Sequence, residues 1–154
     1  MNELEIRIGV IGSRKRDSGT DKLKLFNCLE GLIDRIISAL YYVGRLTFTI
    51  VTGDCNKGGD KFAKEFAEKH NYNLEVKRIK DPATGEEMDF KIPKRFSYYD
   101  MVNIYYARNK ELAESNLDYL VALGNLEKNG GTENTIAYFL NYNNYNVGDR
   151  LVVL

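Results

Sequence analysis

Near its N-terminus the chain contains the stretch Glu5-Ile6-Arg7-Ile8-Gly9-Val10-Ile11-Gly12-Ser13-Arg14. The β-branched residues of this stretch predict a first strand over residues 5–11. Glycine at the end of a strand lets the backbone turn tightly and lets a ligand approach the backbone N–H groups. A strand that ends in a glycine turn and leads into a long helix is typical of the βαβ units of a parallel sheet.

The rest of the chain continues this alternation of strands and helices. Apolar residues recur at three- and four-residue spacing from about Asp21 to Val43, which predicts a long helix that stops before Gly44. Further strands are predicted at residues 47–52, 74–79, 118–123 and 150–154, and further helices at residues 60–71, near Ala107 and at 132–142. The strand at 118–123 is apolar almost throughout, which favours a central position. We therefore expect a Rossmann-like three-layer αβα sandwich whose mainly parallel sheet has about five strands.

One irregular stretch interrupts the alternation, at about residues 81–103. It contains both prolines, Pro82 and Pro93, and we expect an inserted loop or a small hairpin with Met88 to Ile92 as its return strand. A connection of this length is often a lid or a binding loop. No linker, repeat or low-complexity segment divides the chain, so residues 1–154 are predicted to form a single domain.

The composition argues against several classes of protein. Lys plus Arg equals Asp plus Glu at 22 each, whereas nucleic-acid binders usually carry a basic excess. No run approaches the roughly 18 apolar residues of a membrane span, and the N-terminus lacks the pattern of a signal peptide. The two cysteines, Cys28 and Cys55, are too few for a disulfide framework and have no zinc-site spacing. We expect a reduced, cytoplasmic protein with no membrane contact, no metal site and no nucleic-acid partner.

Three glycine-rich turns follow predicted strands, and ligands bind at the carboxyl ends of strands in open parallel sheets. The turns are Gly12-Ser13-Arg14, the segment Gly53-Asp54-Cys55-Asn56-Lys57-Gly58-Gly59-Asp60, and Gly124 together with Gly130-Gly131-Thr132. The second and third turns each end at a helix N-terminus, which is a common anion site. Taken singly, each turn also fits ordinary capping: Thr132 as an N-cap, or Asp60 as a first-turn carboxylate. Three turns at one edge predict a ligand site.

A fourth candidate is the pair Arg108-Asn109, on the helix predicted near Ala107. Arg108 could bind a phosphate and Asn109 a base or a sugar, although by spacing alone a helical arginine more often faces solvent. Tyr98 and Tyr99 in the irregular stretch are candidates to stack on a base. With a single histidine in the chain, acid–base catalysis by histidine is not expected.

Together, four of these segments resemble the SLOG superfamily, a Rossmann-like group that includes the LOG phosphoribohydrolases, DprA and the YspA-type proteins. The matching segments are Ile8-Gly9-Val10-Ile11-Gly12-Ser13-Arg14, Thr52-Gly53-Asp54-Cys55-Asn56-Lys57-Gly58-Gly59-Asp60, Ala107-Arg108-Asn109 and Gly130-Gly131-Thr132. Their order and spacing match over nearly the whole chain outside residues 81–103. The pattern is most similar to the YspA-type branch, whose glycine loop also ends in Gly-Ala/Gly-Asp and whose later helix carries Arg-Asn.

The resemblance implies a nucleotide or a nucleotide derivative as the ligand, with no further cofactor. It places the phosphate near Gly130 to Thr132 and the base or sugar near Gly12 to Arg14, and it makes Arg108 a ligand contact. Because members of the superfamily commonly pair, it also implies a homodimer.

Three functions stay open, in this order. The first is a sensor or carrier that binds a nucleotide or a nucleotide-derived phosphorylated ligand. The second is a nucleotide-processing hydrolase, LOG-like on the N-glycosidic bond or acting on a phosphate bond, with Arg108, Glu133 and Asp60 as candidate catalytic residues. The LOG motif Pro-Gly-Gly-x-Gly-Thr-x-x-Glu, aligned on Gly131-Thr132, has its glutamate where this chain has Thr135, which favours binding over catalysis. The third is DprA-like binding of single-stranded nucleic acid, against which the neutral net charge argues.

Overall fold

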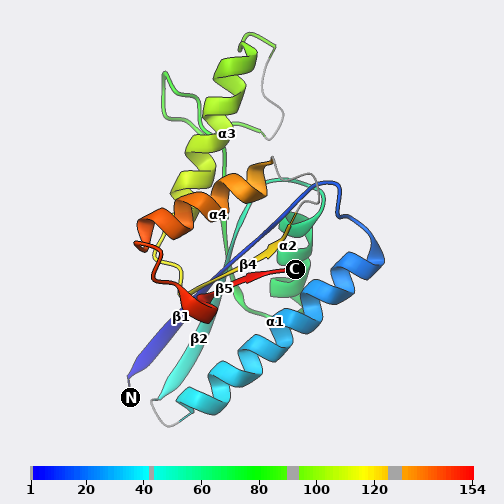
Figure 1. Cartoon of the computed structure of the whole chain (residues 1–154), viewed down its shortest axis with the longest axis vertical. Coiled ribbons are helices and arrows are strands. Elements are labelled where there is room, and N and C mark those ends of the chain that lie inside the picture. Colours follow the sequence, from blue (N-terminus) through cyan, green and yellow to red (C-terminus); the bar gives the residue numbers. More distant parts are fainter. Residues whose placement is uncertain (1, 42–43, 90–93, 125–129) are drawn as a thin grey trace.

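Five parallel strands form the middle layer of the part of the chain that this computed structural model describes, residues 2–41, 44–89, 94–124 and 130–154 (Figure 1). They are β1 (Glu3–Gly12), β2 (Arg45–Gly53), β3 (Asn73–Lys77), β4 (Tyr119–Leu123) and β5 (Leu151–Val153). Their order across the sheet is β3-β2-β1-β4-β5, and every neighbouring pair is parallel. The apolar β4 has neighbours on both sides, as predicted, although the middle strand is β1.

Helices cover both faces of this sheet. The helices α1 (Gly19–Leu40) and α2 (Gly59–His70) pack on one face, and α3 (Tyr98–Ala113) and α4 (Gly131–Tyr142) pack on the other (Figure 1). A short 3-10 helix, η1 (Gly148–Arg150), leads into β5. The result confirms the predicted Rossmann-like three-layer sandwich. Within the described residues, no helix is both long enough and apolar enough to cross a membrane.

Each face of the sheet has its own apolar core. The core under α1 and α2 contains Ile8, Leu29 and Phe66, all completely buried. The core under α3 and α4 is smaller and is built around Leu120 and Phe139. Because the residues of a strand alternate between faces, β1 and β2 supply both cores.

The long first helix begins earlier and ends earlier than its apolar spacing predicts. It starts at Gly19, because Ser18 and Asp21 form a capping box around its first turn. It ends at Leu40, with Tyr41 as its C-cap, rather than continuing to Val43, which lies outside the described residues. Gly44 follows with φ of +132° and starts the return into β2.

The stretch expected to be irregular, residues 81–103, is in part a helix, which corrects the prediction. A second capping box, between Ser97 and Asp100, starts α3 at Tyr98. Within the described residues, the expected hairpin is present as an antiparallel bridge between Lys80 and Glu87, and the Met88 N–H donates to the Ile79 carbonyl oxygen at 2.9 Å. The part of its return strand at residues 90–92 lies outside the described residues.

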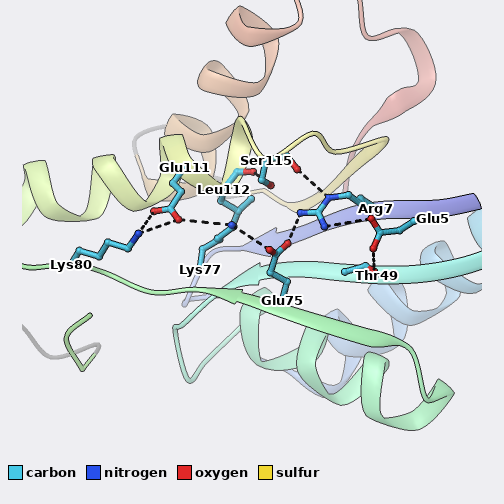
Figure 2. Close-up of polar contacts among 9 residues, drawn as sticks. All are labelled: Glu5, Arg7, Thr49, Glu75, Lys77, Lys80, Glu111, Leu112 and Ser115. Carbon is cyan, nitrogen blue, oxygen red and sulfur yellow. Dashed lines mark hydrogen bonds and ion pairs between the residues drawn. The ribbon is translucent and has the colours of Figure 1, made fainter. Parts of the chain in front are cut away.

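A ladder of polar side chains crosses β1, β2 and β3 and reaches the end of α3, as Figure 2 shows. Arg7 donates to the Ser115 carbonyl oxygen at 3.1 Å and pairs with Glu75. The other contacts are Thr49 with Glu5 at 2.7 Å, Lys77 with Glu75 at 3.4 Å and with Glu111 at 3.8 Å, and Lys80 with Glu111 at 3.2 Å. These ion pairs therefore add to the apolar contacts of Leu112 and Ala113 that join α3 to the sheet.

Candidate functional site

A cleft of about 430 Å³ lies at the carboxyl edge of the sheet. The chain leaves β1 toward α1 on one face and leaves β4 toward α4 on the other face. Such a change of direction between two adjacent strands opens a crevice, which is where ligands bind in open α/β sheets. The volume is in the range of pockets that hold small molecules.

The cleft brings together most of the residues predicted to bind a ligand. It is lined by Gly12, Ser13, Arg14, Gly53, Asp60, Arg108, Asn109, Gly130, Gly131 and Thr132. The predicted residues that do not line it are Asp54, Gly58, Gly59 and Gly124. All three glycine turns thus contribute to one cleft, but the individual residues have different roles.

Gly12 and Gly59 are required by the packing of two backbone segments. A Cβ on Gly59 would lie 2.4 Å from the Gly12 nitrogen, and a Cβ on Gly12 would lie 2.9 Å from the Gly59 Cα. Real Cβ atoms do not approach backbone so closely, so both positions need glycine for α2 to start against the end of β1. This reason differs from the predicted one, the close approach of a ligand.

The loop that leads into α2 is bonded by a carboxylate of the protein, at the N-cap residue Gly58. Gly58 has φ of +66°, and its N–H donates to Asp17 Oδ1 at 2.8 Å. The same Asp17 oxygen accepts from Lys61 Nζ at 2.7 Å, and this bond is the main reason that the pKa of Asp17 is lowered. The second glycine loop is therefore closed by the loop that follows β1. Gly124 is engaged in a similar way, because its N–H donates to the Leu154 carbonyl oxygen at 3.1 Å.

The N-terminus of α4 opens into the cleft and, like that of α2, has no side-chain cap. The N-cap is Gly130, two residues before Thr132, the residue expected to have that role. The N–H groups of Gly131 and Thr132 have no acceptor among the described residues, and both residues line the cleft. Uncapped N–H groups at the positive end of a helix dipole are a ready anion site.

Arg108 is buried and held by the protein, unlike the solvent-facing arginine that spacing alone favours. Its Nη1 lies 2.5 Å from Asp54 Oδ1, and its Nε donates to Asn109 Oδ1 at 3.0 Å. The side chains of Arg108 and Asp54 are 11% and 1% exposed. The Arg108 Nη2 group makes no hydrogen bond or ion pair with any described residue, so it is available to a ligand in the cleft.

Asn109 links α3 to the first turn of α4. Its Nδ2 donates to Asn134 Oδ1 at 3.1 Å and to the Gly131 carbonyl oxygen at 3.4 Å, while its Oδ1 accepts from Arg108. Although Asn109 borders the cleft, its amide is engaged by protein groups on both sides. It positions Arg108 and the N-terminus of α4 relative to each other.

Asp60 lies at the floor of the cleft and is 5% exposed. Its Oδ2 accepts from the Cys55 N–H at 3.2 Å, and its Oδ1 lies 3.3 Å from Thr52 Oγ1. Burial raises the pKa of the Asp60 carboxyl, against the opposing effects of Arg108 and the Cys55 N–H. Burial also raises the pKa of the Cys55 thiol, so Cys55 is a packed thiol and not an activated nucleophile.

Tyrosines on α3 form the wall of the cleft opposite the glycine turns. Tyr98, Tyr105 and Tyr106 line it, together with Val102. Tyr98 is largely exposed, with 76% of its surface accessible. Tyr105 is more buried, and this burial raises the pKa of its hydroxyl group. Sequence reasoning singled out Tyr98 but missed Tyr105 and Tyr106, whose signal is their spacing from Tyr98 along one face of the helix.

The first turn of α4 carries the residues that bear on catalysis. Glu133 and Thr135 both line the cleft. Thr135, at the position of the LOG glutamate, is buried and its hydroxyl donates to the Gly131 carbonyl oxygen at 2.8 Å. This position therefore offers no carboxylate to a substrate.

The fold and the cleft define this chain as a Rossmann-like α/β protein with a candidate small-molecule site at the carboxyl edge of its sheet. No protein-family model, no curated protein and no solved structure matches the chain. The resemblance to the SLOG superfamily and the expected homodimer therefore stay predictions. In the ranges that the structure describes, no three His, Cys, Asp or Glu side chains are grouped so that they could hold a metal ion.

Proposed function

We propose that the protein binds a nucleotide, or a phosphorylated ligand derived from one, in the cleft between β1 and β4, as a sensor or a carrier. One observation carries the proposal: the uncapped N-terminus of α4 opens into the same cleft as the tyrosines of α3. The first feature suits a phosphate and the second suits an aromatic base.

The phosphate end of the ligand is assigned to Gly131 and Thr132. Their N–H groups would each donate to a phosphate oxygen, and the helix dipole would stabilise its charge. The Nη2 group of Arg108 supplies a charge-assisted donor on the other side. Because Asp54 and Asn109 fix this guanidinium, little side-chain entropy is lost when it binds an anion.

The base or sugar end is assigned to the wall of α3 and the turn after β1. Tyr105 and Tyr106 would stack on a ring, and Ser13 and Arg14 line the cleft where the SLOG resemblance implies a base or a sugar. A cleft of about 430 Å³ is larger than an inorganic phosphate requires, which favours a ligand with an organic part.

Hydrolysis of the nucleotide is the second candidate, and one observation favours it. Asp60 is a buried carboxyl group with a raised pKa that lines the cleft, and such groups are common among catalytic acids. Incubation with ribonucleoside 5′-monophosphates would release free base or phosphate if this candidate holds. Binding without release supports the sensor or carrier.

Ligand-induced thermal stabilisation tests the binding proposal. Four ribonucleoside 5′-monophosphates and inorganic pyrophosphate would be compared on the wild type and on Gly131→Asp. At a ligand concentration of about 100 times Kd, stabilisation is about 2.7 kcal/mol, which raises Tm by about 5–10 °C for a chain of this size. Gly131→Asp should lose this shift, because it places a carboxylate where the phosphate would sit.

A matched control is available at the start of α1. Gly19, like Gly131, follows the N-cap of its helix, and a Cβ there meets nothing within 4 Å. A Cβ on Gly131 meets only Asn109 Nδ2 at 3.5 Å, an ordinary contact, so both variants should fold. Gly19→Asp should keep the full ligand-induced shift. If Gly131→Asp is stabilised as much as the wild type, the phosphate site lies elsewhere.

A further inference from the structure

Asp60 and Arg108 approach each other across Gly53 at the floor of the cleft, but they form no ion pair. A Cβ built on Gly53 would lie 2.5 Å from Arg108 Nη1 and 2.5 Å from Asp60 Oδ2, so these two atoms are at most 5 Å apart. Arg108 Nη1 instead bonds Asp54 Oδ1. Within the described residues, Asp60 forms no ion pair with any cation, and its hydrogen-bond contacts are Cys55 N–H and Thr52 Oγ1.

The hydrogen bonds of Thr52 indicate where a proton lies. Its hydroxyl donates to the Val10 carbonyl oxygen at 2.6 Å, and that carbonyl oxygen has no proton to give. The single proton of the hydroxyl therefore belongs to this short bond. Thr52 Oγ1, 3.3 Å from Asp60 Oδ1, then has no proton left to stabilise a charged Asp60, whereas its lone pair can accept one from a protonated Asp60.

The charges around Asp60 support the same assignment. Arg108 faces it from α3, Lys64 from its own helix α2, and Cys55 from the loop after β2. Asp54, a second carboxyl group from that loop, already neutralises Arg108. Two carboxyl groups that share one guanidinium in a buried place favour protonation of the one that is not paired, and burial raises the pKa of Asp60.

We propose that Asp60 carries a proton at the floor of the cleft, and that an anionic ligand binds together with this proton. A charged Asp60 would repel an anion held by Arg108 and the N-terminus of α4. The neutral acid removes this repulsion and adds an O–H donor to the cleft. Above the pH at which Asp60 titrates, binding therefore takes up one proton from solvent per anion bound. The anion of this step rests on the proposed function, whereas the proton on Asp60 does not.

The proton can be measured without any ligand. Carboxyl-carbon NMR of the protein labelled at its aspartates follows each side chain as pH is raised, and the signal lost in Asp60→Asn assigns Asp60. We expect Asp60 to titrate well above the ordinary range of an aspartate. A midpoint at or below that range overturns the inference, whatever the protein binds.

Binding of sulfate then tests the coupling between anion and proton. Sulfate is a suitable probe because its own charge does not change with pH, and its binding can be followed at the amide signals of Gly131 and Thr132. For the wild type, affinity should fall by up to about tenfold per pH unit above the Asp60 midpoint, the slope for one proton. Asp60→Asn should lose this slope.

The control is Asp34→Asn, an exposed position on α1, which should keep the slope of the wild type. The inference is overturned if the wild type shows no slope, or if the slope persists in Asp60→Asn. If sulfate fails to bind at every pH, the proposed anion site is wrong, and the carboxyl titration alone decides whether Asp60 holds a proton.

Discussion

Replacing Arg108 by methionine should lower the free energy of unfolding by about 3–5 kcal/mol at neutral pH, the usual effect of removing one partner of a buried ion pair. This cost arises because the carboxylate of Asp54 would lose its only ion-pair partner among the described residues. The Asp54 side chain is 1% exposed, it contacts Arg108 at 2.5 Å, and its second oxygen accepts a single N–H, from Ile79 at 3.2 Å. Without the guanidinium, this carboxylate stays buried with one hydrogen bond and no countercharge.

Methionine keeps much of the aliphatic stem of arginine, so lost packing adds little to this figure. The free energy of unfolding of a small domain is commonly about 5–15 kcal/mol in total. The variant should therefore still fold, but it should unfold at a much lower urea concentration than the wild type. Urea unfolding followed by circular dichroism gives the difference. The double variant Asp54→Asn with Arg108→Met should recover part of the loss, because the buried charge is then removed as well.

The same substitution at an exposed ion pair is the control. Arg78 Nε lies 3.9 Å from Glu87, and both side chains are exposed, at 50% and 60%, so Arg78→Met should cost at most about 1 kcal/mol. If Arg108→Met costs no more than Arg78→Met, the pair of Arg108 with Asp54 is not buried in the way described, and the account of a pre-positioned guanidinium is wrong.

Two further predictions concern α2. Gly59→Ala should destabilise the protein by about 1–3 kcal/mol or more, because its Cβ would lie 2.4 Å from the Gly12 nitrogen. The control is Gly31→Ala in α1, where a Cβ meets nothing within 4 Å, and this variant should be more stable than the wild type by up to about 1 kcal/mol. Equal urea midpoints for the two variants would contradict this prediction. Asp60→Asn should become more stable relative to the wild type as pH rises. Burial raises the pKa of Asp60 above its unfolded value near 3.8, so its contribution to stability is fully present below 3.8 and is lost as pH rises through the folded pKa. A constant difference between the urea midpoints at acid and neutral pH would refute this sign.

The sequence predicted the layers of the fold because their signals are local and repeated. The apolar strands and the spacing of residues such as Leu25, Leu29 and Leu32 each report one element, and the parallel order follows from their alternation. The start of α3 at Tyr98 was not predicted, although the capping box Ser97-Tyr98-Tyr99-Asp100 is a local signal for a helix start. The nearby Pro82 and Pro93 point instead to an irregular stretch, because proline disfavours regular structure on both sides of it.

The predicted ligand site combines residues with different roles that a sequence alone does not separate. Gly12 and Gly59 look like phosphate-loop glycines, but the reason for them is a contact between two backbone segments far apart in the chain. The burial of Arg108, on α3, depends on Asp54, which lies in the loop after β2, 54 residues earlier. Such pairs need three-dimensional contacts, whereas the uncapped start of α4 at Gly130-Gly131 was visible from its glycines.

The most direct test of the central claim is an amide NMR titration of the wild type with adenosine 5′-monophosphate. If a phosphate binds at the N-terminus of α4, the largest and saturable shifts should occur at Gly131 and Thr132, together with the side-chain signal of Arg108 Nε. Absence of shifts at α4, or largest shifts on the polar ladder around Arg7 and Glu75, would contradict the claim.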